Sequence, residues 1–166
     1  WADTVAHEFI HLIISKRSKN SIPIWLHEGI AKYYESLWRD KPGLALQPYA
    51  EGQLAKAVES GELVTFAQMH PSMAKLPSQE MTSLAFAEVF TVIEFLRKKH
   101  GARVIPEVLE RAGEGVPLDR ALHGAVGLGL EGLEKAWAKW LRTRPFRAHP
   151  GASPERIKLG DGQGEP

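Results

Sequence analysis

The sequence contains no cysteine, which excludes disulfide bonds, thiolate catalysis and zinc sites built from cysteine. It also lacks an apolar run close to the roughly 20 residues that a membrane-spanning helix requires. Neither charge sign dominates: the formal net charge is +1, which argues against a nucleic-acid partner. The remaining composition, 43% hydrophobic and 25% charged residues in a chain of 166, is typical of a globular domain with one core.

Histidine and glutamate occur together near the start of the chain, where residues 7–11 read HEFIH within an apolar, helix-forming run. Residues four apart lie on one face of a helix, so His7 and His11 can offer two imidazole nitrogens to one metal ion. Glu8 lies about 100° around the helix from His7. At the edge of that face it can touch a water molecule on the metal without displacing it.

A third ligand is expected from the segment at residues 25–31, which reads WLHEGIA. Glu28 in this segment is the natural candidate, because catalytic zinc commonly has three protein ligands and one open position, and two histidines with one glutamate are a recurring set. The sequence therefore predicts one Zn²⁺ per chain, held by His7, His11 and Glu28. Glu8 is predicted to be the general base that activates a water molecule for attack on a carbonyl group.

These two segments resemble the gluzincin zinc metallopeptidases, in particular the bacterial peptidase MA-like domains and, more distantly, the catalytic domain of the aminopeptidase-N family. The resemblance extends through the AFAE and HG segments at residues 85–88 and 100–101 to WAKWL at residues 137–141. It implies the same roles for His7, His11, Glu28 and Glu8, and a peptide or protein substrate. In gluzincins a small β-sheet precedes the first zinc-binding helix. We therefore expect a mainly α, N-terminally truncated helical part of a zincin-like catalytic domain, with the rest of a larger polypeptide upstream.

The apolar spacing is helical along most of the chain, without the sustained alternation of a strand. Cap residues, glycines and prolines place the expected helices at residues 3–14, 25–39, 48–60, 78–100, 104–112, 118–124 and 130–142. The basic stretch at residues 15–21 is expected to be a loop. We expect the catalytic domain to span residues 1–144. Residues 145–166 are expected to form a disordered tail, because they are rich in proline, glycine and charge.

Three further residues are interpreted by their helical positions. His27 points about 100° away from Glu28. It is therefore expected not to be a metal ligand, but to lie at the surface or to contact a ligand from outside the metal site. Glu35 lies on the same face as Glu28 and is either a solvated carboxylate, which is the favoured interpretation, or a partner that orients a zinc-bound histidine. Glu88 is expected at the surface rather than in the cleft.

The sequence does not identify the residue that would donate a hydrogen bond to the oxyanion, because Phe86 occupies the position where a tyrosine would be expected. In the relatives that the chain resembles, the long helix tends to begin Ala-Tyr-Ala, and phenylalanine cannot donate a hydrogen bond. Losing one oxyanion donor lowers the rate by about 10²–10³-fold. The other candidates are Tyr33, Tyr34, Tyr49, His70 and His100.

Three functions follow from these observations. The first is a zinc metallopeptidase, supported by the three-ligand set and by Glu8. The second is a catalytically weak or inactive metal-binding interaction module of a larger protein, supported by Phe86 and by the missing sheet. The third is a helical adaptor with an accidental motif and no stoichiometric metal. The identity of the native metal stays open, because this ligand set also holds other divalent ions. The sequence does not determine the substrate, the endo- or exopeptidase mode or the oligomeric state. The compartment is not determined, although similarity to the relatives makes an extracytoplasmic or envelope-associated site the expectation.

Overall fold

The computed structural model describes residues 1–39 and 46–147, and every regular element in these ranges is a helix. The elements are α1 (Ala2–Ser18), α2 (Ile24–Tyr34), the 3-10 helix η1 (Leu37–Arg39), α3 (Pro48–Ser60), the 3-10 helix η2 (Met73–Lys75), α4 (Gln79–His100), α5 (Val104–Gly113), α6 (Leu118–Val126) and α7 (Leu130–Leu141). The mainly α fold class is therefore confirmed. Residues 148–166, most of the predicted tail, lie outside the described ranges.

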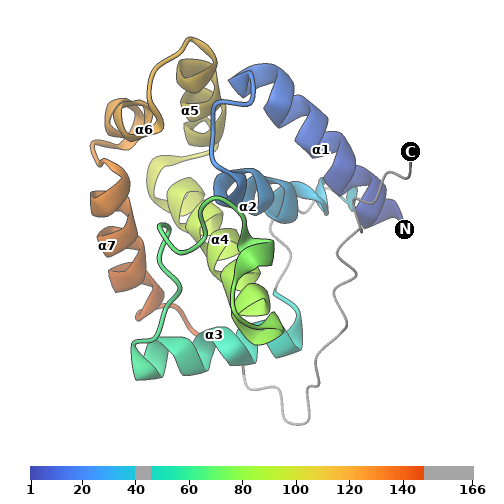
Figure 1. Cartoon of the computed structure of the whole chain (residues 1–166), viewed down its shortest axis with the longest axis vertical. Coiled ribbons are helices and arrows are strands. Elements are labelled where there is room, and N and C mark those ends of the chain that lie inside the picture. The colour runs from blue at the N-terminus through green and yellow to red at the C-terminus, as the bar shows by residue number, and fades with distance from the viewer. Residues whose placement is uncertain (40–45, 148–166) are drawn as a thin grey trace.

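Helix α4 is the centre of the fold, and α2, α3, α5 and α7 pack around it (Figure 1). Its core-facing side chains include Val92, Ile93 and Leu96, which are fully buried. The helix begins where the Ser78 hydroxyl accepts a hydrogen bond from the Met81 N–H at 3.1 Å, the usual way to satisfy an unpaired N–H at a helix start. It ends at His100, as predicted, and Gly101 follows as the C-terminal cap. The long central helix thus gives the shorter helices one common surface.

Helix α1 is fixed at its C-terminal end. The carbonyl oxygen of Arg17 approaches α5 so closely that a Cβ atom on Gly113 would lie only 2.1 Å from it. The Ser21 hydroxyl also donates a hydrogen bond to the Ala112 carbonyl at 2.9 Å. These contacts hold the end of α1 against α5. The helix also packs against α2, toward which it presents His7 and His11.

Helix α2 meets α4 at Gly29, where an added Cβ atom would lie 2.8 Å from the carbonyl oxygen of Val89. Glycine inside a helix costs about 1 kcal/mol relative to alanine, and here it permits the close approach of the two helices. Because Gly29 faces α4, the neighbouring Glu28 is free to face α1. The glycine that follows Glu28 in the motif therefore has a packing role.

Two predicted helix ends were wrong. Helix α1 continues to Ser18, so residues 15–18 are helical rather than part of a loop. The buried Ser18 hydroxyl donates to the Ile14 carbonyl at 2.8 Å, basic side chains in the last turn favour the helix end, and Lys19 turns the backbone at φ 51°. Helix α2 ends at Tyr34 instead of residue 39, and the chain continues into η1, where the indole N–H of Trp38 donates to the Asp3 carboxylate on α1 at 2.7 Å.

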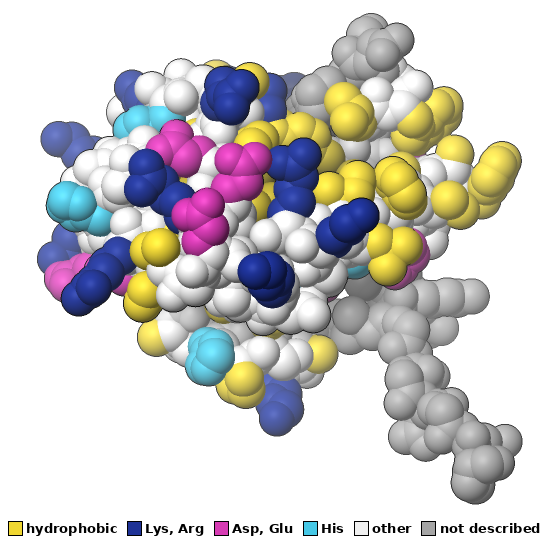
Figure 2. All heavy atoms as spheres, turned by 90° about the horizontal axis from the view of Figure 1, so that it is seen from above, with side chains coloured by type: hydrophobic (Ala, Val, Ile, Leu, Met, Phe, Trp, Pro, Cys, Tyr) yellow, Lys and Arg dark blue, Asp and Glu magenta, His cyan; other side chains and the backbone are white. Residues whose placement is uncertain are grey.

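The outer side of α1 is apolar. The exposed large hydrophobic side chains of the described residues all belong to the first 38 residues, and they are Trp1, Val5, Phe9, Leu12, Ile13, Ile24, Leu37 and Trp38. Figure 2 shows apolar side chains gathered on one side of the molecule. In α1 only Ile14 and Ser18 are buried. No helix in the described part of the chain is long and apolar enough to cross a membrane.

Glu88 is buried, which corrects the prediction of a surface carboxylate. Its side chain is fully enclosed, and its Oε1 accepts a hydrogen bond from the Val64 N–H at 2.9 Å. Burial raises the pKa of Glu88 to about 8, and the Glu134 carboxylate adds to the effect. Glu134 itself accepts from the N–H of Phe66 at 2.7 Å. The two acids hold the loop from which Phe66 stacks on Trp25, with ring centroids 4.2 Å apart.

Candidate metal centre

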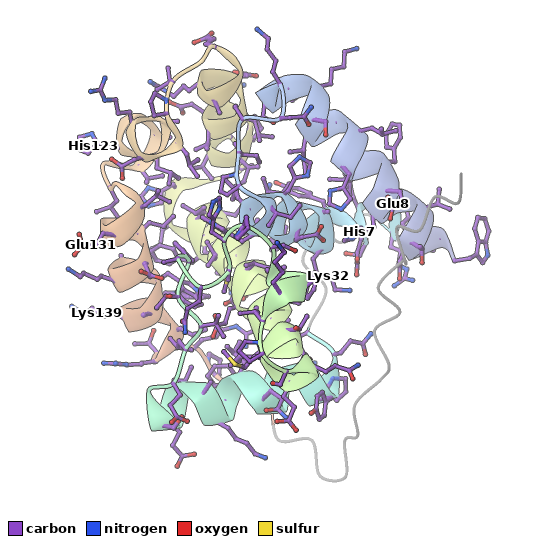
Figure 3. The ribbon with its side chains drawn as sticks, in the orientation of Figure 1. His7, Glu8, Lys32, His123, Glu131 and Lys139 are labelled. Carbon is purple, nitrogen blue, oxygen red and sulfur yellow. The ribbon has the colours of Figure 1, made fainter. Side chains whose placement is uncertain are left out.

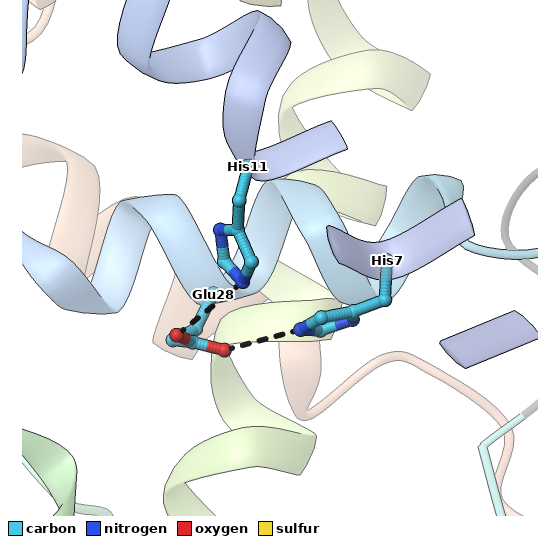
Figure 4. Close-up of side chains that lie close together, drawn as sticks. All are labelled: His7, His11 and Glu28. Carbon is cyan, nitrogen blue, oxygen red and sulfur yellow. Dashed lines mark ion pairs between the residues drawn. The ribbon is translucent and has the colours of Figure 1, made fainter. Parts of the chain in front are cut away.

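Three side chains from two helices meet where α1 crosses α2. His7 and His11 of α1 face Glu28 of α2, and one nitrogen or oxygen from each lies within 4.8 Å of the other two. His7 Nε2 is 3.5 Å from Glu28 Oε2, and His11 Nε2 is 3.6 Å from Glu28 Oε1 (Figure 4). The two imidazole rings stand edge to face with centroids 4.7 Å apart. The sequence motif and the crossing of the helices therefore bring together all three predicted metal ligands.

The spacing between Glu28 and each histidine, measured to a different carboxylate oxygen in each case, is close to that around a tetrahedral metal ion. Zinc ligands lie about 2.0–2.1 Å from the ion, so two ligand atoms at a tetrahedral angle are about 3.3 Å apart. The nitrogen–oxygen distances of 3.5 and 3.6 Å differ from this value by only a few tenths of an ångström. The donor set, two imidazoles and one carboxylate, also suits zinc and other divalent ions.

Each imidazole uses its other nitrogen for an outer contact. His7 Nδ1 is hydrogen-bonded to Glu35 Oε2 at 3.1 Å, and Lys32 holds the second oxygen of Glu35 at 2.7 Å. His11 Nδ1 lies 2.9 Å from Nδ1 of His27. Such contacts fix the orientation of a metal-binding histidine and the nitrogen that carries its proton. The interpretation of Glu35 as a solvated carboxylate was wrong, because it orients His7.

The side chains of the cluster shift one another's pKa values. Burial favours neutral His7, but its hydrogen bonds and charge interactions with Glu28 and Glu35 outweigh this and raise its pKa to about 9. For His11, burial and the charge of His7 lower the pKa despite the nearby Glu28. Burial and His11 likewise lower the pKa of His27. Burial acts to raise the pKa of Glu28, but the hydrogen bond from His7 and the charges of the three nearby histidines outweigh it and hold this pKa below its ordinary value. Without a metal, His7 is therefore an imidazolium paired with two carboxylates.

A cleft of about 530 Å³ opens beside the cluster. Its lining residues are Glu8, His11, Ser15, Asn20, Ile22, Ile24, His27 and Glu28. Glu8 therefore shares the cleft with two of the candidate ligands, while it stays outside the three-residue cluster. Figure 3 places Glu8 and His7 close together on α1. This arrangement leaves the Glu8 carboxylate available to a water molecule or a substrate.

Comparison with known proteins agrees with this geometry. A family model described as the Peptidase MA superfamily matches residues 1–143, which include the cluster, the cleft and all seven α-helices of the described residues. The chain belongs to the Peptidase MA superfamily. A search among curated proteins and a search among solved structures found no match.

Membership of the Peptidase MA superfamily confirms the resemblance inferred from the motifs, but the structure assigns no oxyanion donor. None of the five candidates lines the cleft. The Tyr33 ring is buried and packs beside Phe90. The Tyr34 hydroxyl accepts a hydrogen bond from Arg97, and the Tyr49 hydroxyl accepts one from Gln53 at 2.8 Å. These tyrosines have structural partners.

Proposed function

We propose that this chain is a zinc-dependent metallopeptidase domain that hydrolyses peptide bonds, with Glu8 as general base. The observation that carries the proposal is the three-residue cluster of His7, His11 and Glu28 beside a cleft that Glu8 lines. Structural zinc sites usually have four protein ligands, whereas catalytic sites keep one position open. A cluster of three ligands next to a carboxylate that is not a ligand therefore favours catalysis.

In the proposed reaction His7, His11 and Glu28 hold the metal. A divalent metal held there supplies Lewis-acid chemistry, which acidifies water and polarises a carbonyl group. Glu8 accepts a proton from the attacking water and then delivers it to the leaving amine. Glu35 keeps the Nδ1 proton of His7 engaged, so that its Nε2 is available for the metal. No side chain forms a covalent bond to the substrate in this scheme.

Metal binding is expected to depend steeply on pH. His7 must lose a proton when the metal binds, and its pKa of about 9 keeps it protonated at neutral pH. The pKa values of His11 and Glu28 are lowered, which favours their metal-binding forms. Zinc affinity should therefore rise about 100-fold between pH 6 and pH 8, compared with about fourfold for a histidine of ordinary pKa. Calorimetric titration in buffers of different ionisation enthalpy should show release of about one proton per zinc at pH 7.

Glu35→Gln provides the control for this pH dependence. Removing the carboxylate lowers the pKa of His7, so the variant should show a shallower rise in affinity between the same two pH values. A wild-type affinity that changes fourfold or less would show that the carboxylates do not hold a proton on His7.

The activity is tested on the zinc-loaded chain with a mixture of peptides, using mass spectrometry to find new termini. Cleavage should occur, should stop when a chelator removes the metal, and should return when zinc is restored. Glu131→Gln is a suitable matched control, because this residue lies on α7 far from the cluster (Figure 3) and pairs only with Lys135 in the described residues. Binding of one zinc ion without any cleavage would contradict the peptidase proposal.

The second candidate is a metal-binding interaction module with weak or no catalysis. One observation favours it: none of Tyr33, Tyr34, Tyr49, His70 and His100 lines the cleft with Glu8, and Phe86 has no donor group. The two candidates predict the same metal content and differ in turnover. The peptide assay therefore separates them.

A further inference from the structure

His27 contacts the three-residue cluster without belonging to it. Its Nδ1 lies 2.9 Å from Nδ1 of His11, and the two rings are 27° from parallel with centroids 5.1 Å apart. His11 belongs to α1 and His27 to α2, so the contact depends on how the two helices cross. The scheme proposed above gives His27 no role.

The direction of this hydrogen bond follows from the atoms that each ring has available. His11 Nε2 faces Glu28, 3.6 Å from its Oε1, so Nε2 is the atom that binds the metal. A neutral imidazole that binds through Nε2 keeps its proton on Nδ1. His11 therefore donates and Nδ1 of His27 accepts. This requires His27 to carry its own proton on Nε2.

We propose, on the basis of the metal centre proposed above, that His27 is the positioning residue of His11. By accepting the Nδ1–H, it fixes the ring orientation and the tautomer that present Nε2 of His11 to the metal. Glu35 does the same for His7 at 3.1 Å. The two metal-binding imidazoles thus have chemically different acceptors, a carboxylate for His7 and a neutral imidazole for His11.

The chemistry of the cleft explains why a neutral acceptor suits this position. Glu8 and Glu28 line the same cleft as His27. A carboxylate at position 27 would add negative charge beside them, and a nearby like charge disfavours the ionised form of an acid. An imidazole holds His11 without placing a further negative charge beside the proposed general base.

The proposal is tested by the zinc affinity of three proteins: the wild type, His27→Phe and His27→Asn. Phenylalanine keeps a ring but removes the acceptor, so His27→Phe should bind zinc about 10–100-fold more weakly. Asparagine carries an amide oxygen that can accept from His11, so His27→Asn should recover most of the lost affinity. His123→Phe is the matched control: this histidine is exposed on α6, away from the cluster (Figure 3), and its replacement should leave the affinity unchanged.

A spectroscopic measurement on the zinc-loaded wild type tests the bond itself. In ¹⁵N-labelled protein, the Nδ1 proton of His11 should exchange slowly with solvent and show coupling to Nδ1 of His27. This coupling should be absent from His27→Phe. A role of His27 in packing alone would not produce it. Because the spectrum needs no variant, it decides the proposal even where His27→Phe does not fold.

Two kinds of failure are distinguishable. Wild-type affinity in His27→Phe, an affinity in His27→Asn as weak as in His27→Phe, or no coupling between the rings would overturn the positioning role and leave the metal centre intact. A wild-type chain that binds no zinc would overturn the proposed metal centre and this role together.

Discussion

Glu8→Gln should retain one zinc ion per chain and lose peptide hydrolysis by about 10²–10⁴-fold, the range of general acid–base contributions. Glutamine has nearly the same shape as glutamate but cannot accept the proton of the attacking water. Glu8 lies outside the three-residue cluster and lines the cleft, so its replacement should leave the metal ligands undisturbed. The measurement is the rate of peptide cleavage together with metal content for the same preparation.

The matched control for this experiment is Glu131→Gln, which removes one exposed carboxylate from α7. Its metal content and its rate should equal those of the wild type. If Glu8→Gln cleaved peptides at the wild-type rate, Glu8 would not be the base. If it lost the metal as well, Glu8 would instead belong to the ligand set.

Glu28→Ala should weaken zinc binding by more than the roughly 10–100-fold that loss of an outer partner costs. Glu28 is the carboxylate that faces both histidines, at 3.5 and 3.6 Å. Without it two neutral imidazoles remain, and they offer the ion neither a third ligand nor a negative charge. Zinc should therefore give the wild type a higher unfolding temperature and have little effect on the variant. Thermal unfolding with and without zinc measures this difference.

Comparing Glu28→Ala with Glu35→Gln distinguishes the loss of a metal ligand from the loss of a nearby negative charge, because both variants remove a carboxylate beside His7. Glu35 hydrogen-bonds to Nδ1 of His7, the nitrogen that does not face Glu28. Above pH 9, where protons no longer compete for His7, its replacement should therefore weaken zinc binding within the 10–100-fold range. Equal affinity losses in Glu28→Ala and Glu35→Gln would contradict the assignment of Glu28 as a ligand. Comparing the metal-free variants by circular dichroism shows whether either change disturbs the helices.

Much of the helical fold was predictable, because glycine, proline and cap residues set helix ends locally. The third helix was predicted from Pro48 to Ser60, and α3 has these bounds with Gly61 at φ 76°. The start of α4 at the Ser78 cap was predicted for the same reason. The ends of α1 and α2 were missed because tertiary contacts determine them. Ser18 is buried against Gly113 of α5, and the indole of Trp38 hydrogen-bonds to Asp3 on α1.

The candidate site was predictable to the extent that spacing along one helix determines it. His7 and His11 lie four residues apart and had to share a face, and Glu28 of the second motif was the expected third ligand. The partners of those ligands were harder to predict. The contacts of Glu35 with His7 and of His27 with His11 join residues 28 and 16 positions apart, and they depend on the crossing of α1 and α2.

The burial of Glu88 was not visible in the sequence for a related reason. A carboxylate is normally found at the surface, and Glu88 is buried because the loop at residues 62–66 covers it and supplies the N–H of Val64. Helical periodicity indicates which residues share a face, but it does not indicate what covers that face. The close approach at Gly29 depends in the same way on the partner helix α4.

Metal content per chain is the measurement that tests the central claim most directly. The purified wild type is incubated with zinc, dialysed, and analysed by plasma mass spectrometry beside Glu28→Ala prepared in the same way. A metal centre formed by His7, His11 and Glu28 predicts close to one zinc per wild-type chain and far less in the variant. A wild type without zinc, or a variant that holds as much zinc as the wild type, would contradict it.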